Sequence, residues 1–110
     1  YSDYYNGENY AFCLLLRASL LQECEEKMEL KVIAKHIYRE VFESNRNYVE
    51  DEVNTDYEIW TLATLASCSL VLNKKELSDK YEKSFLSRAD KMMKTSYLSQ
   101  KQKLVELLKS

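Results

Sequence analysis

Three cysteines and a single histidine are the residues of this chain whose side chains could support catalysis or bind a metal ion. Cys13 or Cys24 together with His36 could in principle form a nucleophilic Cys–His dyad. A dyad of this kind also needs a residue that orients the histidine, and the sequence offers no clear candidate. With Cys68 the same residues could supply four zinc ligands, but they lack the short paired spacings typical of structural zinc sites. We therefore predict no catalytic residue, no metal site and no cofactor, and interpret the chain as a protein without enzymatic activity.

The number and spacing of the cysteines also bear on the redox compartment. They are odd in number, contain no C-x-x-C pair, and two of the three lie in apolar helical runs. Cysteines of this kind typically behave as small buried hydrophobic residues in a reducing environment. We therefore expect free, buried thiols and a cytoplasmic location.

The composition of the chain indicates an all-α fold. Its 110 residues include one glycine, Gly7, and no proline, which leaves few positions for the tight turns that β-rich folds require. A chain of this length typically forms one domain with a single core. No apolar run is long enough to span a membrane, and no signal peptide is visible. Because the chain begins at Tyr1 rather than at methionine, we expect it to be a piece of a longer protein.

Hydrophobic periodicity predicts five helices in this domain. Their approximate ranges are 9–23, 25–44, 57–72, 75–93 and 97–108. The first two would form one antiparallel hairpin over residues 9–44, the next two a second hairpin over 57–93, and the last a terminal capping helix. The predicted apolar faces of the first and second helices consist of Tyr10, Leu14, Leu15, Ala18 and Leu21, and of Leu30, Ile33, Ala34, Ile37, Val41 and Phe42.

The polar segment 45–55, between the two hairpins, has the composition of a loop that ends in a helix cap. Asn54, Thr55 or Asp56 could be the N-cap, because each has a short side-chain oxygen that can accept from the first free N–H groups. The acidic residues 50–52 could bind a cation, but the segment lacks the glycine and the alternating oxygen ligands of an EF-hand loop. We interpret them as part of a solvated loop.

The third and fourth predicted helices contain the most informative pattern in the chain. Aromatic, small and turn residues follow one another as expected for two closely packed helices: Trp60, Ala63, Ala66, Asn73, Leu77, Tyr81 and Phe85. This pattern resembles a tetratricopeptide repeat. The chain departs from the usual repeat at Asn73, where glycine is common, and at Ser78 and Ser84, where the second helix usually has alanine.

Two further segments carry a more particular resemblance. The opening D-Y-Y-N-G-E-N-Y-A at residues 3–11 and the later D-Y-E-I-W-T-L-A-T-L-A at residues 56–66 resemble the tetratricopeptide-like region of bacterial repeat proteins and of the TRAFs-binding region of apoptosis signal-regulating kinases. In that family a hydrophobic residue usually stands between the glycine and the asparagine, where this chain has Glu8. The resemblance covers residues 3–85 and implies a scaffold for protein–protein interaction in a signalling or regulatory protein.

In such a scaffold the partner lies across the inner face lined by the first helix of each hairpin. We expect the partner to be a protein or a peptide, including another domain of the same chain, and neither nucleic acid nor a membrane. The residues that we expect to be exposed beside this face and to contact the partner are Tyr5, Arg17, Glu58 and Thr61. Among aromatic residues near the N-terminus, Tyr5 and Tyr10 could instead pack against the second helix or a preceding repeat, which is the interpretation that we favour.

Charge is distributed unevenly along the chain. Residues 1–73 contain 6 basic and 13 acidic side chains, a net charge of −7, whereas residues 74–110 contain 10 basic and 5 acidic side chains, a net charge of +5. The basic part could bind an acidic partner or a nucleic acid, but its lysines are dispersed and few aromatic residues separate them. The chain could also be a structural spacer between domains or, less favoured, a small helical enzyme.

Overall fold

The computed structural model describes residues 3–47 and 55–110, with only the backbone described for residues 3–6. In this part of the chain the secondary structure consists of five α-helices and no strand. The helices are α1 (Asp3–Ser19), α2 (Glu25–Asn45), α3 (Asp56–Val71), α4 (Lys75–Arg88) and α5 (Lys91–Lys109). The predicted all-α class is confirmed.

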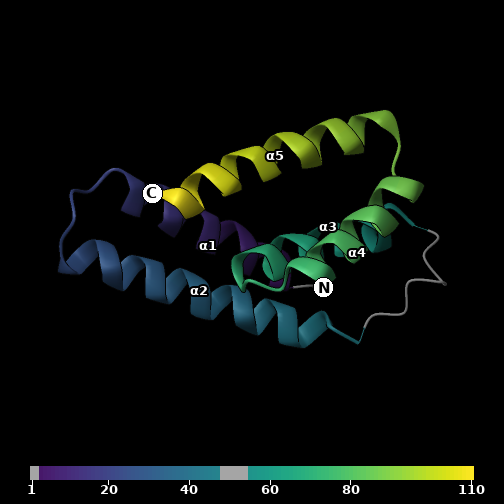
Figure 1. Ribbon diagram of the computed structural model, residues 1–110. Coiled ribbons are helices and arrows are strands. Elements are labelled where there is room, and N and C mark those ends of the chain that lie inside the picture. The colour runs from purple at the N-terminus through teal and green to yellow at the C-terminus, as the bar shows by residue number, and fades with distance from the viewer. Residues whose placement is uncertain (1–2, 48–54) are drawn as a thin grey trace.

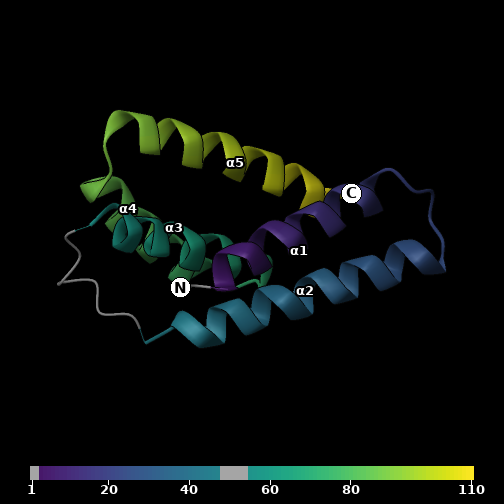
Figure 2. The same ribbon diagram turned by 180° about the vertical axis from the view of Figure 1, so that it is seen from behind.

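The pairs of helices differ in how extensively they contact each other. The most extensive backbone contacts join α1 to α2 and α3 to α4, and α2 also packs against α3. Helix α5 contacts both α1 and α3. Figures 1 and 2 show α2 and α5 on opposite sides of the molecule, with α1, α3 and α4 between them. The last helix therefore lies over helices that are far from it in sequence.

All five helices contribute to one hydrophobic core. Its buried side chains include Leu15 of α1, Tyr38 of α2, Leu62 of α3, Phe85 of α4 and Leu104 of α5. Helices α1, α2, α4 and α5 also have an exposed polar face, whereas α3 is buried over most of its length, so the core lies around α3. The five helices thus share a single core rather than two separate ones.

Close approach of α1 to α2 depends on Gly7. A Cβ atom at this position would lie 3.2 Å from Cγ2 of Val41 and 3.8 Å from Cγ2 of Ile37. The first distance is shorter than an ordinary van der Waals contact between carbon atoms. The single glycine of the chain therefore lets α2 pack directly against the backbone of α1.

The turn between α3 and α4 is built around Asn73. This residue has a φ of 60°, in the left-handed region that asparagine tolerates better than most residues. The N–H of Asn73 donates to the carbonyl of Leu70 (3.2 Å), and the N–H of Lys74 donates to the carbonyl of Ser69 (2.8 Å). These two bonds form a Schellman motif, which satisfies carbonyls that the end of a helix leaves free. The predicted turn residue is confirmed.

Four predicted helix boundaries are wrong. The first helix begins at Asp3 rather than near residue 9 and ends at Ser19. The fourth ends at Arg88 rather than near residue 93, because Ala89 is extended and Asp90 caps α5 by accepting from the N–H of Met93 at 2.8 Å. The fifth helix therefore starts at Lys91, six residues before the predicted start at 97.

Some predicted core positions also differ from the structure. Tyr10 is 58% exposed and Ile33 46% exposed, whereas the next residue in each case, Ala11 and Ala34, is buried. Ala11 lies three, four and seven residues before the buried Leu14, Leu15 and Ala18, so it shares their face of α1. The predicted placement of Tyr10 on the apolar face of the first helix is thus wrong.

Candidate functional site

The residues with catalytic or metal-binding potential do not come together. In residues 3–47 and 55–110 no group of three or more His, Cys, Asp or Glu side chains is placed to hold a metal ion. His36 is exposed on α2, with Nε2 2.9 Å from Oε1 of Glu40. All three thiols are free, but only Cys68 is buried; Cys13 and Cys24 are exposed. The expectation that the cysteines are buried is therefore wrong for those two.

A buried polar contact joins α1 to α3 at Glu8. Oγ1 of Thr64 donates to Oε1 of Glu8 at 3.0 Å, and the hydroxyl of Ser67 also hydrogen-bonds this carboxyl group. Tyr38 of α2 and Cys68 of α3 are close enough for the charge of Glu8 to act on them. Glu8 thus occupies the junction of three helices, at the position where the resembled family usually has a hydrophobic residue.

Burial of Glu8 alters its acidity and that of its neighbours. Loss of solvation raises the pKa of Glu8 from 4.5 to about 7, although the hydrogen bonds from Thr64 and Ser67 favour the ionised form. Burial also raises the pKa of Tyr38 and of Cys68, and the negative charge of Glu8 adds to both shifts. Near neutral pH the Glu8 carboxyl group is therefore present in both protonation states.

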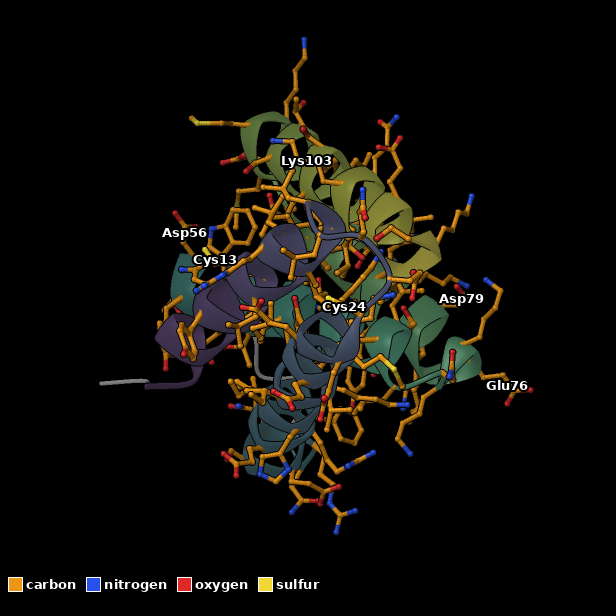
Figure 3. All side chains as sticks on the ribbon, turned by 90° about the vertical axis from the view of Figure 1, so that its left-hand side faces the viewer. Cys13, Cys24, Asp56, Glu76, Asp79 and Lys103 are labelled. Carbon is orange, nitrogen blue, oxygen red and sulfur yellow. The ribbon has the colours of Figure 1, made fainter. Side chains whose placement is uncertain are left out.

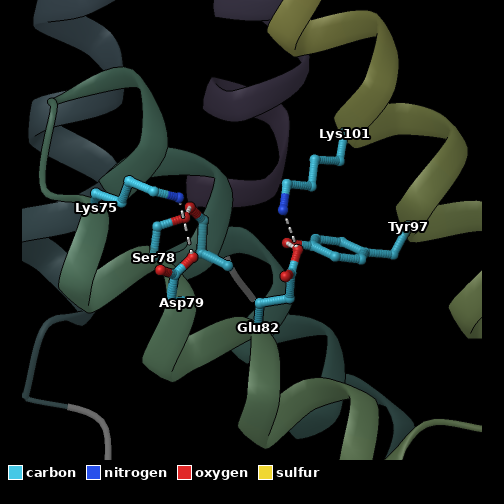
Figure 4. A network of polar contacts seen from close by, with 7 residues as sticks. Lys75, Ser78, Asp79, Glu82, Tyr97 and Lys101 are labelled. Atoms are coloured by element: carbon cyan, nitrogen blue, oxygen red, sulfur yellow. Dashed lines mark hydrogen bonds and ion pairs between the residues drawn. The ribbon is translucent and has the colours of Figure 1, made fainter.

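A second polar cluster connects α4 to α5 at Glu82. The hydroxyl of Tyr97 donates to Oε1 of Glu82 at 2.8 Å, and Nζ of Lys101 lies 2.6 Å from the same oxygen (Figure 4). The side chains of Glu82 and Lys101 are 19% and 29% exposed. Charge-assisted hydrogen bonds that are partly shielded from water are stronger than those of exposed pairs. Glu82 is therefore the main polar anchor of α5.

Aromatic side chains pack behind this cluster. The ring of Phe85 lies 5.4 Å from that of Trp60 and 4.9 Å from that of Tyr97, measured between centroids, and both pairs are tilted. Burial raises the pKa of Tyr97, and its hydrogen bond to Glu82 adds to the shift. Tyr97 therefore stays a neutral hydrogen-bond donor. The prediction that Trp60 packs within the fold is confirmed by this contact.

Of the predicted partner-contacting residues, two lie in α1 and two in α3. Arg17 is exposed near the end of α1, with Nη2 3.7 Å from Oε1 of Glu26. Glu58 is partly buried at the start of α3, and its carboxylate accepts from Oγ1 of Thr55 at 2.9 Å. Tyr5 lies in α1, and its side chain is outside the described residues.

Thr61 does not have the expected exposure. It is 2% exposed, and its hydroxyl donates to the carbonyl of Tyr57 at 3.1 Å, one turn earlier in α3. Ten residues between Thr61 and Val71 are buried, so this helix is covered on nearly all sides. The expectation that Thr61 flanks an open face is therefore wrong.

Two further sequence expectations concern the segment before α3. Thr55 is the N-cap among the three candidates: its Oγ1 accepts from the N–H of Glu58 at 3.1 Å. Residues 50–52, interpreted as a solvated acidic loop, lie outside the described residues.

No family model, curated protein or solved structure matches this chain. Its function must therefore be inferred from the contacts within the chain itself.

Sequence reasoning missed the two polar clusters. Tyr97 and Lys101 are four residues apart, a spacing that places them on one face of a helix, and this spacing is a signal for a shared acceptor. The choice of Glu82 as that acceptor has no signal in the sequence, because it depends on how α5 crosses α4. Glu8 is visible in the sequence only as a departure from a hydrophobic pattern.

None of the helices within residues 3–47 and 55–110 combines the length and the apolar character needed to cross a bilayer.

Proposed function

We propose that this chain is a non-catalytic module for protein–protein interaction within a larger regulatory or signalling protein. Its fold would be a tetratricopeptide-like, right-handed stack of two antiparallel hairpins, α1–α2 and α3–α4, followed by a terminal helix. The partner is a protein or peptide, or another segment of the same polypeptide.

The observation that carries this proposal is the packing of α5 against the other helices. This helix places Met93, Tyr97 and Leu104 against the other helices, where each is less than 10% exposed. Its contacts reach both α1 and α3, the first helices of the two hairpins. A surface on which one amphipathic helix packs in this way has the shape and chemistry for helix recognition.

Three local features support a repeat-like stack. Asn73 adopts the left-handed conformation that a glycine would have at the same turn. Ser78, which replaces an alanine of the repeat, is 3% exposed and donates to the carbonyl of Ala66 at 2.9 Å, so α3 and α4 remain close. Gly7 allows a similarly close approach of α1 to α2.

Arg17 offers a test of this function. The chain would be used to capture proteins from an extract of its native source, and each candidate would then be purified and titrated against the chain by calorimetry. We expect Arg17→Glu, on the exposed flank of α1, to change the affinity at least tenfold. Arg39→Glu is the matched control, because Arg39 is exposed on α2, and Figure 1 shows α2 and α5 on opposite sides of the molecule. Equal affinities for both variants would move the surface elsewhere, and the absence of any partner would favour the structural spacer.

A further inference from the structure

Helix α5 is attached to the rest of the fold by one narrow apolar face. Its three buried residues, Met93, Tyr97 and Leu104, are separated by four and seven positions, so they follow one side of the helix. Leu107 continues this line and packs partly against the core. Most of the remaining positions are exposed and polar. This is the pattern of a helix that lies in a groove rather than of a helix buried on all sides.

The same face carries a polar recognition element. Tyr97 and Lys101 both reach Oε1 of Glu82, at 2.8 and 2.6 Å. One carboxylate therefore helps to fix the position of α5 along α4, because a shift by one turn would leave at most one of the two side chains beside it. An apolar stripe supplies affinity in such a contact, and the Tyr-x-x-x-Lys pair supplies the register.

Charge also favours α5 at this position. Five lysines at 91, 94, 101, 103 and 109, against Glu106 alone, give the helix a net charge of +4. The three helices that face it, α1, α3 and α4, together contain 7 acidic and 5 basic side chains, a net charge of −2. Opposite net charges of this kind favour a basic over an acidic helix at this surface.

The attachment of α5 is less extensive than that of the other helices. The closest backbone packing lies within the pairs α1–α2 and α3–α4, and α5 makes fewer close approaches to the rest of the fold. Along the chain, only Ala89 and Asp90 lie between α4 and α5. Rotation at these two residues would release α5 while leaving the pairs α1–α2 and α3–α4 assembled, and such a unit opens at lower cost than a central one.

We propose that α5 is a displaceable, built-in occupant of a helix-binding surface formed by α1, α3 and α4, and that the partner is a basic amphipathic helix that presents a Tyr-x-x-x-Lys pair to Glu82. The inference rests on the proposed function, since it specifies the partner and the regulation of the same module. A tethered α5 competes at an effective concentration on the order of millimolar, so only a partner that matches its pattern gains access.

Hydrogen exchange of the full chain is the first test, because it requires no substitution. We expect the amides of α5 to exchange at least tenfold faster than those in the middle of α2 and α3, after correction for intrinsic rates. Equal protection of α5 and α3 would mean that α5 opens only on global unfolding, and would overturn the proposal.

A charge exchange tests the partner chemistry. The probe is a synthetic peptide of residues 90–110, titrated into the full chain carrying Glu82→Lys, which weakens the tethered α5. We expect the peptide with Lys101→Glu to bind this variant at least tenfold more tightly than the unchanged peptide does. The peptide with Lys103→Glu is the matched control, since Lys103 is exposed on α5 (Figure 3) and should give no gain.

A second chain variant controls for changes in overall charge. Glu76→Lys lies on α4 at the edge of the molecule, away from α5 in Figure 3, and should bind the three peptides with equal, weak affinity. Peptide affinities that follow net charge alone would overturn the proposal. So would a concentration-dependent dimer of the unchanged chain with exchanged α5 helices, because the occupant would then be a second copy.

The two proposals can fail separately. A captured partner could bind the unchanged chain and the Glu82→Lys variant with equal affinity. This result would support the proposed interaction module and contradict the proposal that α5 controls access to it. A chain with no partner would overturn the proposed function, whereas the exchange and peptide experiments would still report whether α5 can be displaced.

Discussion

Oγ1 of Thr64 on α3 donates a hydrogen bond of 3.0 Å to Oε1 of Glu8 on α1. This bond joins residues that are 56 positions apart in the sequence, on two helices that both contact α5. The carboxyl group lies where its ionised form is poorly solvated, and this raises its pKa to about 7. The contact between α1 and α3 therefore contains a group that titrates close to neutral pH.

Glu8 should make the stability of the domain depend on pH. In the unfolded chain its pKa is near 4.5, so between pH 4.5 and 7 the folded state binds more protons than the unfolded state. The free energy of unfolding should therefore fall as pH rises through this window and level off, through this group, at about pH 8. At about 1.4 kcal/mol per pKa unit, the expected loss is about 3–4 kcal/mol. Urea denaturation between pH 4 and 8 measures it.

Glu8→Gln is the informative variant for this effect. A glutamine keeps an oxygen that can accept from Thr64 but carries no charge, so the decrease between pH 4.5 and 7 should largely disappear. The exposed Glu76→Gln removes one charge without this burial and should retain the decrease. Parallel pH profiles for Glu8→Gln and the unchanged chain would contradict the assignment.

The turn at Asn73 should tolerate glycine and resist alanine. Its φ of 60° costs a residue with an ordinary Cβ about 1–2 kcal/mol, whereas glycine adopts this conformation without a steric penalty. We expect Asn73→Ala to lower the free energy of unfolding by about 1–2 kcal/mol and Asn73→Gly to leave it within about 0.5 kcal/mol. Chemical denaturation followed by circular dichroism measures both.

The same substitution elsewhere controls for composition. Asn47→Ala lies at an exposed position without a positive φ and should have little effect. If Asn73→Ala and Asn47→Ala were equally mild, the left-handed conformation of residue 73 would be contradicted.

Local patterns in the sequence predicted those parts of the fold that depend on local physics. The second helix follows from an apolar period of three and four residues between Leu30 and Phe42, and the turn at Asn73 follows from the tolerance of asparagine for positive φ. The N-cap at Thr55 similarly needs only a short side chain with an oxygen. In each case the interacting groups are within a few residues of one another.

The break between α4 and α5 was missed for an equally physical reason. A helical spacing of three and four residues continues across Ala89 and Asp90, through positions 77, 81, 85, 88 and 92. Periodicity alone therefore shows no interruption of the helix. The only local signal is Asp90, whose carboxylate caps the following helix. The exposed Met92 and the buried Met93 show that the face changes at this point.

The two polar clusters depend on contacts between residues far apart in the sequence. Such contacts could not be predicted from one sequence. Glu82 meets Tyr97 and Lys101 only because α5 crosses α4, and Glu8 meets Thr64 only because α1 packs against α3. Neither contact changes the spacing of apolar and polar residues within the helices that it joins.

Phe85 should be the most sensitive single position in the core. It is fully buried between Trp60 and Tyr97, so truncation removes two ring contacts and leaves a cavity where α3, α4 and α5 meet. We expect Phe85→Ala to lower the free energy of unfolding by about 3–5 kcal/mol. The emission of Trp60, the only tryptophan, reports the transition. Tyr10→Ala, at a 58% exposed aromatic residue, should cost less than about 1 kcal/mol; similar losses for both would contradict the core described here.

The three cysteines should differ sharply in reactivity. Cys13 and Cys24 are exposed, whereas Cys68 is fully buried and has a pKa raised by that burial, which suppresses its reactive thiolate form. A thiol reagent at neutral pH should therefore modify two cysteines rapidly in the folded chain and the third only at the rate of unfolding. Adding guanidinium chloride should make all three react rapidly. Cys68→Ala should abolish the slow phase alone, while three fast-reacting thiols under native conditions would show that the face of α3 that carries Cys68 is open to solvent.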